Sequence, residues 1–503
     1  MSPQTSIAAT FFTFIALFVG VGLYSGSQKQ DTTGDYLLAG RDINPWFTAL
    51  STVATGNSGF MFIGLIGFTY HIGLSAIWLP VGHLIGDGLA WLTVHRRLRQ
   101  VSEDVEVETV SAFLGHGIPG GRWVVRLSAL ITLGLLGTYA AAQLQAGSKA
   151  LSVLFGWPSA WGMVFGAAIV AIYCVSGGIR ASIWVGSVQS ILMIVSMLAL
   201  SAVAIARCDG LGGLWQQLQG IDPSLLSLTP TGLHFGAAPF ILAWIVAGFG
   251  VVGQPHIMVR AMAIDSVKGV GAARNIYLLF NTLFSMSALL VGLTARVLLP
   301  SLATGDAELA LPELSMALLP ALMVGLVLVG LFSATISTAD AQLLSCSAAL
   351  TQDLLPGDSS YRAARVGTLV MVVFVLGVAL VSPDNVFTLV TFAWAALAAS
   401  LGTVMVVRAL QWPITGAIAI AMMVSGIGSA LVWRMVLHWS GDVYEVLPAM
   451  GVSGGVYGIG LLLTQRLRRV PPAPQAATEA TNPPQALKKF DGGSDPVATE
   501  QVR

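Results

Sequence analysis

The sequence predicts an all-α polytopic membrane protein with about thirteen transmembrane helices. Only 10% of its 503 residues are charged, whereas soluble domains carry about 25%. Hydrophobic residues make up 55% of the chain and recur in runs long enough to cross about 30 Å of hydrocarbon. The basic residues fall mainly on one alternating set of the connections between these runs.

Thirteen helical spans can be drawn from the apolar runs. The first, 6–24, has no basic residue before it and no small-residue cleavage site after it, so we expect a retained helix rather than a signal peptide. The three cysteines match no disulfide or metal spacing. The other expected spans are 46–72, 73–94, 123–154, 157–177, 183–205, 236–257, 275–299, 320–352, 365–382, 386–408, 413–434 and 447–465.

The connections between spans predict the orientation, because short cytoplasmic loops collect Lys and Arg. One set holds Arg41, "HRRLR" (95–99), Arg180, Arg260 and "RLRR" (466–469), whereas the other set is poor in basic residues. We therefore expect a multi-pass protein of the cell membrane with its N-terminus outside and its C-terminus in the cytoplasm. The transmembrane domain covers 1–469, and the Pro-, Ala- and Gln-rich segment 470–503 is predicted to be a disordered cytoplasmic tail.

Two of the spans are predicted to be broken. Glycines and polar residues interrupt the second span in "STVATGNSGF" (51–60), and three glycines and a proline interrupt the seventh in "AGFGVVGQPH" (247–256). Broken backbone survives in a bilayer only where it is buried in protein or lines a cavity. These spans begin two five-helix units, 46–205 and 236–408, which indicates an inverted-repeat transporter. Close packing of helices through small residues is the alternative for each glycine cluster.

Four segments resemble a known family. They are "LLAGRDINPWFTALS" (37–51), "YCVSGGIRASIW…VQ" (173–189), "GQPHIMVRAMAIDS" (253–266) and "STADAQLL" (337–344). In this order they are similar to the sodium:solute symporter family, and within it to the sodium/proline symporter branch. The resemblance implies a LeuT-type inverted repeat of five helices, with an extra N-terminal helix at 6–24 and two C-terminal helices within 413–465.

The resemblance also implies a sodium site between the second and ninth spans. Its ligands would be the backbone carbonyls of Ala54, Asn57 and Ala334 and the hydroxyls of Ser337 and Thr338. Sodium is a hard cation that prefers oxygen ligands, and an unwound helix supplies free carbonyls. The three ninth-span positions are spaced i, i+3 and i+4, so they share one helix face. Hydrogen bonding of the two hydroxyls to the preceding turn is the alternative.

The chain departs from that branch at two carboxylates. Gly56 stands where the proline branch has an aspartate tied to sodium use, and Gly186 stands where many members have another. Asp340 follows Ser337 by three residues, and we hypothesise that it supplies a carboxylate to a second cation site with Ser337, opposite Gly186. The alternative is that Asp340 is protonated, or faces a cytoplasmic water cavity and hydrogen-bonds only Ser337.

Three more polar residues are candidates for gating and proton transfer. Arg41 resembles a family arginine at the cytoplasmic end of the second span, which implies a role in gating or ion release; a positive-inside anchor is the alternative. His83 and Asp87 are spaced i, i+4 in the third span, and such a pair can carry a proton. A satisfied polar contact inside the bundle is the other interpretation.

The solute is expected in a cavity between the second, fourth and seventh spans, where N–H groups of the broken helices suit a carboxylate. Compared with the proline branch we expect less aromatic surface, because Ala247 and Val251 fall at two of its aromatic positions and Trp244 lies about one turn away. Core packing is the alternative role for the aromatic candidates. The candidate solute-binding residues are Thr55, Ser58, Gly59, Phe60, Tyr139, Gln143, Ala247, Val251, Gln254 and Pro255.

Together these observations predict secondary-active, cation-coupled uptake of a small organic solute by alternating access. An amino acid such as proline, or a small carboxylate, is the expected solute, with Na⁺ as coupling ion and H⁺ as the alternative. A solute-sensing membrane domain without net transport is a further alternative. The expected partners are the solute and the lipid bilayer, with no nucleic acid and no obligate protein partner. HExxH and GxSxG motifs are absent, so no enzyme is predicted.

Overall fold

The computed structural model describes residues 2–28, 30–355, 360–382 and 386–469. The chain divides into two units, Met1–Leu461 and Leu462–Arg503. In the second unit only the end of one helix is described, so the predicted disordered tail, 470–503, lies outside the described residues. The sites below all belong to the first unit.

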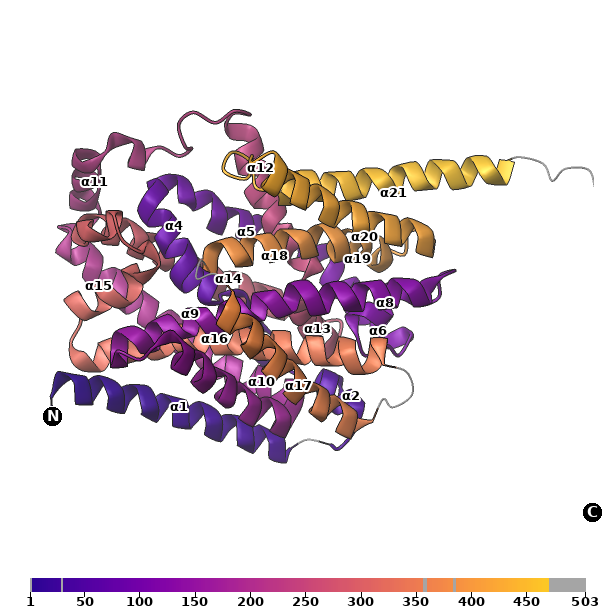
Figure 1. Cartoon of the computed structure of the whole chain (residues 1–503), viewed down its shortest axis with the longest axis horizontal. Coiled ribbons are helices and arrows are strands. Elements are labelled where there is room, and N and C mark those ends of the chain that lie inside the picture. Colours follow the sequence, from indigo (N-terminus) through magenta and orange to yellow (C-terminus); the bar gives the residue numbers. More distant parts are fainter. Residues whose placement is uncertain (1, 29, 356–359, 383–385, 470–503) are drawn as a thin grey trace, which may run out of the picture. The chain divides into compact units, whose positions relative to one another are not determined.

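Within these ranges every element is helical, apart from one isolated bridge between Ile43 and Ile264 (Figure 1). Short 3-10 and π turns join several helices. The α-helices are α1 (Pro3–Ser27), α2 (Thr33–Leu38), α3 (Pro45–Gly56), α4 (Leu65–Ile72), α5 (Trp78–Ala90), α6 (Arg96–Asp104), α7 (Val110–Gly115), α8 (Gly121–Ile131), α9 (Gly137–Phe155), α10 (Ser159–Arg207), α11 (Gly210–Ile221), α12 (Ala237–Phe249), α13 (Pro255–Ala263), α14 (Gly269–Leu298), α15 (Ala310–Leu318), α16 (Ala321–Ala348), α17 (Tyr361–Val381), α18 (Val386–Leu397), α19 (Thr403–Ala409), α20 (Gly416–Leu431) and α21 (Val446–Arg469).

The described residues contain ten helices long and apolar enough to cross a membrane, or eleven if one bent pair counts as a span. Two of these ranges, Phe60–Asp104 and Ser159–Arg207, have 45 and 49 residues, whereas one crossing needs about 20. If each crosses twice, the count rises from eleven to the predicted thirteen. The all-helical membrane class is confirmed; the count of thirteen and the inverted repeat stay predictions.

The turn inside α10 lies at Gly178. Its φ of 55° is one that side-chain-bearing residues rarely adopt. A Cβ at this position would also lie only 2.5 Å from the Tyr36 carbonyl oxygen. Glycine is therefore required here both by the backbone and by the packing of α2 against α10.

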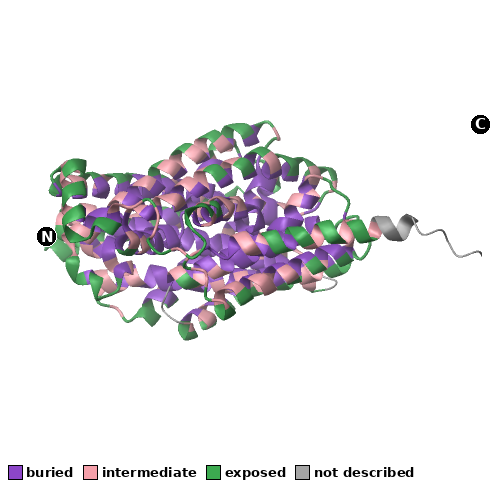
Figure 2. Ribbon diagram, turned by 90° about the horizontal axis from the view of Figure 1, so that it is seen from above, coloured by how far each residue is buried: buried purple, intermediate pink, exposed green. Residues whose placement is uncertain are grey.

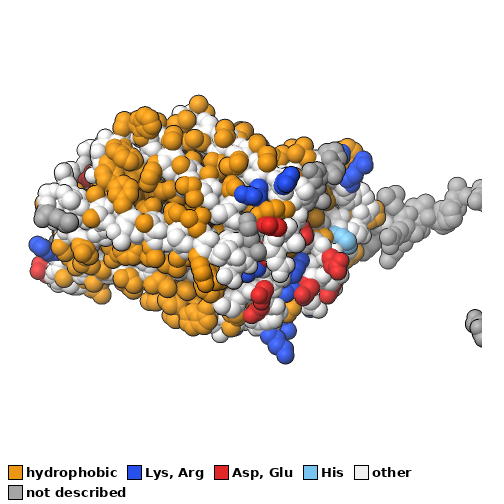
Figure 3. All heavy atoms as spheres, turned by 90° about the horizontal axis from the view of Figure 1, so that it is seen from below, with side chains coloured by type: hydrophobic (Ala, Val, Ile, Leu, Met, Phe, Trp, Pro, Cys, Tyr) orange, Lys and Arg blue, Asp and Glu red, His pale blue; other side chains and the backbone are white. Residues whose placement is uncertain are grey.

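The outward-facing side chains are those expected next to lipid. Figure 3 shows apolar side chains covering most of the displayed face, with Lys, Arg, Asp and Glu gathered mainly near one end. Buried residues concentrate between the helices, as Figure 2 shows. Many of the buried side chains are nevertheless polar, including Ser, Thr, Asn, Gln and Asp. Inside a membrane bundle buried Ser, Thr, Asn and Gln often hydrogen-bond between helices, whereas buried ionisable side chains such as Asp mark candidate functional sites.

Both predicted helix breaks are present. α3 begins after Asn44, whose side chain accepts a hydrogen bond from the Phe47 N–H, and ends at Gly56. Asn57 and Ser58 lie outside the helices before the chain continues toward α4. α12 and α13 meet at an angle of 60°. The segments that flank these helices also touch, because the Asp265 N–H, after α13, donates to the Ile43 carbonyl, before α3, at 2.8 Å.

Candidate functional site

The structure brings the broken end of α3 next to the middle of α16. Thr338 Oγ1 donates toward the carbonyl oxygens of Thr55 and Ala334, each 3.0 Å away. The contact with Ala334 is a hydrogen bond to the preceding turn of the same helix, which was the alternative role for this hydroxyl in the sequence analysis. The Thr55 contact crosses between helices, and sequence reasoning missed it because Thr55 was expected to bind solute.

The neighbouring hydroxyl has a different environment. Ser337 Oγ is fully buried and has no hydrogen-bond partner among the described residues. Asn57 is also buried, and its side chain is bound to Asn281 on α14, with 2.7 Å between Nδ2 and Oδ1. The break therefore places one carbonyl oxygen at the buried Thr338 hydroxyl, next to the Ser337 hydroxyl, which has no partner among the described residues. Oxygen groups of this kind suit a hard monovalent cation.

Close packing holds the broken segment against two other helices. The Gly59 N–H donates to Gln143 Oε1 on α9 at 2.8 Å. A Cβ at Gly59 would lie 2.6 Å from the Ala146 side chain and 2.8 Å from that of Thr335. Only glycine lets α9 and α16 approach the break this closely.

A small cavity of ≈ 20 Å³ lies beside the break. Phe60, Tyr139 and Ala247, three of the predicted solute residues, line it. His83 lines it too, although the sequence suggested only a proton-carrying role for this residue. The rest of the lining consists of Gly56, Trp244, Val390, Thr391, Trp394 and Tyr444.

Besides Phe60 and Tyr139, the cavity has aromatic residues that the sequence did not place there. Trp244 lines the cavity together with Trp394 of α18 and Tyr444, which precedes α21. Trp394 Nε1 donates to the Ala247 carbonyl at 2.8 Å, and Tyr444 Oη donates to the Thr391 carbonyl at 2.6 Å. Since these polar atoms already have partners, the two residues contribute mainly apolar ring surface to the cavity.

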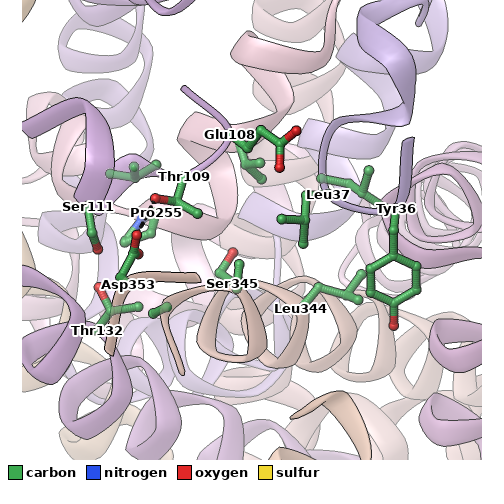
Figure 4. Close-up of a pocket in the computed structure, with 15 residues that line it drawn as sticks. Tyr36, Leu37, Glu108, Thr109, Ser111, Thr132, Pro255, Leu344, Ser345 and Asp353 are labelled. Atoms are coloured by element: carbon green, nitrogen blue, oxygen red, sulfur yellow. Dashed lines mark hydrogen bonds between the residues drawn. The ribbon is translucent and has the colours of Figure 1, made fainter. Parts of the chain in front are cut away.

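The other predicted solute residues do not line this cavity. Ser58 Oγ lies 3.3 Å from Tyr139 Oη, and Gln254 Nε2 donates to the Trp394 carbonyl at 3.2 Å. Val251 is buried in the turn between α12 and α13. Pro255 lines a different cavity of ≈ 30 Å³, together with Glu108 and Asp353 (Figure 4).

Asp340 contacts α10 one helical turn before Gly186. Asp340 Oδ1 accepts a hydrogen bond from Ser182 Oγ at 2.6 Å, so the alternative that it hydrogen-bonds only Ser337 is wrong. Ser337 itself faces Gly186, where an added Cβ would lie 3.1 Å from the Ser337 hydroxyl oxygen.

Comparison with known proteins now decides the family. The model of the sodium:solute symporter family matches residues 36–426. The chain belongs to the sodium:solute symporter family. The resemblance carried by the four sequence segments is thereby confirmed, and this symporter is a multi-pass membrane transporter and not an enzyme.

Relatives and solved structures agree with this assignment. The symporter is 30% identical to the sodium/proline symporters of Salmonella typhimurium (strain LT2) over 492 residues and Escherichia coli (strain K12) over 490, in each case 94% of this chain and 95% of the relative. A Na⁺-coupled sialic acid symporter, solved substrate-bound and outward-open, superposes with a TM-score of 0.76 at 17% identity, covering 91% of this chain and 98% of that one. A nucleobase-cation-symport-1 family transporter in a closed conformation gives 0.54 at 16% identity, with 84% and 95% covered. These structures support a LeuT-type fold.

Arg41 joins three segments at the arginine-rich end of the symporter, the end that carries Arg41, Arg99 and Arg180. Its guanidinium donates to the carbonyls of Met262 at 3.0 Å, Ser102 at 3.0 Å and Val107 at 2.8 Å. These bonds connect the turn before α3 to the end of α13, to α6 and to the loop after α6. The gating role that the resemblance implies for Arg41 stays a prediction.

Aromatic rings separate the small cavity from a larger one at the opposite end. The larger cavity has ≈ 420 Å³ and is lined by Phe68, Phe387 and Lys149, among others. Phe387 stacks on Phe60 at 5.3 Å and on Phe68 at 5.0 Å between ring centroids. The Phe387 N–H donates to Glu308 at 3.0 Å, and Lys149 Nζ contacts the same carboxylate at 2.6 Å. These rings therefore form a thin partition between the two cavities.

His83 and Asp87 are neighbours, as predicted. His83 Nδ1 lies 3.8 Å from Asp87 Oδ2, and the same oxygen accepts a hydrogen bond from Tyr277 Oη at 2.6 Å. A Cβ at Gly56 would have only this Tyr277 oxygen within 4 Å, at 3.7 Å. Asp87 thus lies behind the position where the proline branch has its aspartate.

Proposed function

We propose that this symporter couples the uptake of a small amino acid, with proline as the first candidate, to Na⁺ bound between α3 and α16. The proposed ligands are the carbonyls of Ala54, Asn57 and Ala334 and the hydroxyls of Ser337 and Thr338. The observation that supports this proposal most strongly is the contact of the Thr338 hydroxyl with the Thr55 carbonyl. The neighbouring Ser337 hydroxyl has no partner among the described residues. A buried polar group without a partner costs about 1–3 kcal/mol, which a bound cation would offset.

The small cavity beside the break is lined by aromatic rings, which supports a solute that is recognised through an alkylated ammonium group. Ring faces attract cations, with Trp the strongest of the aromatic side chains. Its lining contains Trp244 and Trp394 but no Asp or Glu from the described residues. The proline ammonium is part of an apolar ring and suits such a surface, while N–H groups of a broken helix suit its carboxylate. At ≈ 20 Å³ the cavity holds about one water, so binding of proline requires that the surrounding helices move apart. The relatives named sodium/proline symporters support this choice.

Alternating access then needs an obstruction at each end of the solute cavity. The partition of Phe60, Phe387 and Phe68 supplies one, and the bonds of Arg41 supply the other. In the predicted orientation the arginine-rich end is cytoplasmic. Release of solute and Na⁺ into the cytoplasm would require that the hydrogen bond between Arg41 and the Met262 carbonyl breaks.

Proton coupling is the second candidate, favoured by the position of His83 in the lining of the solute cavity. The titratable groups near this histidine and its partner Asp87 are Tyr277 and His95. Uptake driven by a pH gradient in sodium-free buffer, abolished by His83→Gln, would support this candidate over Na⁺.

Uptake of radiolabelled proline by reconstituted vesicles tests the proposal directly. An inward Na⁺ gradient should drive accumulation, and an equal choline gradient should not. Ser337→Ala should raise the Na⁺ concentration for half-maximal uptake. Ser333→Ala is the matched control, because the Ser333 hydroxyl bonds the Val329 carbonyl of its own helix. Equal Na⁺ dependence in all three proteins would refute the proposed site.

A further inference from the structure

A buried cluster of opposite charges lies one helical turn from the proposed Na⁺ ligands. It consists of Asp340 on α16, Ser182 on α10 and Arg260 on α13, none more than 1% exposed. The sequence placed Arg260 in a basic cytoplasmic loop, and this was wrong. α13 extends to Ala263 and is packed against α16, which carries Arg260 into the bundle.

The hydrogen bonds of the cluster have a fixed direction. A guanidinium has only donors, and a hydroxyl has a single proton. Arg260 Nη2 donates to Ser182 Oγ at 3.1 Å, so the Ser182 proton goes to Asp340 Oδ1 at 2.6 Å. The second arm of Arg260 is occupied as well, since Nη1 donates to the His256 carbonyl at 2.5 Å. The chain of bonds runs from the cation, through the hydroxyl, to the carboxylate.

Each charge explains the burial of the other. Arginine stays protonated in proteins, so a buried arginine needs a counter-charge. Asp340 is the acidic side chain whose charge acts on Arg260. Tyr173 and the Ala341 backbone also interact with the Asp340 carboxylate. A cation placed at Asp340 Oδ2 would be repelled by the guanidinium held at the neighbouring hydroxyl.

We propose that Arg260 is the built-in counter-cation of Asp340. This carboxylate then takes no second Na⁺, and one Na⁺, bound at Ser337 and Thr338, accompanies each solute. The inference rests on the proposed function and replaces the second cation site expected from the sequence. Arg260 is a positioning residue: it holds Asp340, and with it the Na⁺-binding turn of α16, against α10 and α13.

A double-mutant cycle tests this pairing. Arg260→Gln and Asp340→Asn each leave one buried charge unpaired, so each should lower the maximal uptake rate about tenfold or more. The double variant, with neither charge, should recover most of that loss, and Arg260→Lys should retain more activity than Arg260→Gln. Wild type and double variant should both show a Na⁺ Hill coefficient of about 1.

The matched control is Asp353→Asn, which removes another carboxyl at the end of the same helical span. Asp353 bonds Thr109, and no arginine takes part in that bond, so Arg260→Gln should not rescue this variant. If the single variants fail to fold, the level of folded double variant in the membrane reports the same rescue. A double variant no better than Asp340→Asn, or a wild-type Hill coefficient near 2 that falls to 1 in Asp340→Asn, would overturn the proposal.

Failure of the proposed function gives a different pattern. In that case Ser337→Ala leaves Na⁺-dependent thermal stabilisation of the purified symporter unchanged. The pairing of Arg260 with Asp340 is still decided by the unfolding temperatures of the two single variants and the double variant without Na⁺. Rescue there supports the pairing, and additive losses refute it.

Discussion

Replacing Thr338 by valine tests the proposed Na⁺ site with little change of shape. Valine has the same branched outline as threonine but no hydroxyl oxygen. The substitution removes the contact with the Thr55 carbonyl and one proposed Na⁺ ligand. A contact with a charged group contributes about 1.5–3 kcal/mol, whereas a neutral hydrogen bond contributes about 0.5–1.5 kcal/mol. Every 1.4 kcal/mol is about a tenfold change in affinity.

We therefore expect Thr338→Val to raise the Na⁺ concentration for half-maximal proline uptake about 10- to 100-fold. The unfolding free energy without Na⁺ should fall by about 1 kcal/mol. Thr338→Ser keeps the oxygen and should stay close to wild type. The assay is initial-rate uptake in vesicles over a wide range of Na⁺ concentrations at constant ionic strength.

Thr335→Val is the control on the same helix. Its hydroxyl is buried and donates to the Phe332 carbonyl at 2.7 Å, within α16. If Thr338→Val and Thr335→Val change the Na⁺ requirement equally, the effect comes from altered packing of α16. The assignment of Thr338 as a ligand is then refuted.

Three further outcomes are expected. Trp394→Ala should raise the solute concentration for half-maximal uptake about tenfold with little change in Na⁺ dependence, because a ring face is lost from the cavity; isotherms for both ligands check this. Gly59→Ala should lower the unfolding temperature through overpacking of about 1–3 kcal/mol against Ala146, measured by thermal unfolding in detergent. Burial raises the pKa of Glu108, in the loop before α7. As the pH rises above about 4.3 toward this raised pKa, the stability of the wild type should therefore fall relative to that of Glu108→Gln. Unfolding temperatures measured between pH 4 and 7 would show this fall, and parallel curves for the two proteins would contradict the prediction.

The helix breaks could be predicted from the sequence because their cause is local. A cluster of glycines and polar residues inside an apolar run weakens the helix at that position, whatever the rest of the chain does. The hydroxyls of Ser337 and Thr338 were expected as ligands from the family resemblance, and their spacing on one helix face agrees with that expectation. The Thr338 contact with the break needed only that α3 and α16 pack together.

Contacts between distant segments could not be predicted. Trp394 and Tyr444 reach the cavity through the packing of α18 and of the segment before α21, and no pattern in either segment relates it to α3. Arg260 was assigned to a loop because Lys and Arg usually mark cytoplasmic connections. Its burial depends on Ser182 and Asp340, which lie 78 residues before it and 80 residues after it in the sequence.

The α3 break lies between the two proposed binding sites, and this suggests how they are coupled. On one side, the Thr55 carbonyl contacts Thr338 at the proposed Na⁺ site. On the other side, Gly56 and Phe60 line the solute cavity. A cation that fixes the carbonyls of the break would also fix the residues just after the break. The part of the solute cavity that these residues line would then be ordered before the solute binds. By linkage, the factor by which Na⁺ raises solute affinity must equal the factor by which solute raises Na⁺ affinity. If both proposed sites bind their ligands, a segment of about six residues shared by them would provide this coupling locally.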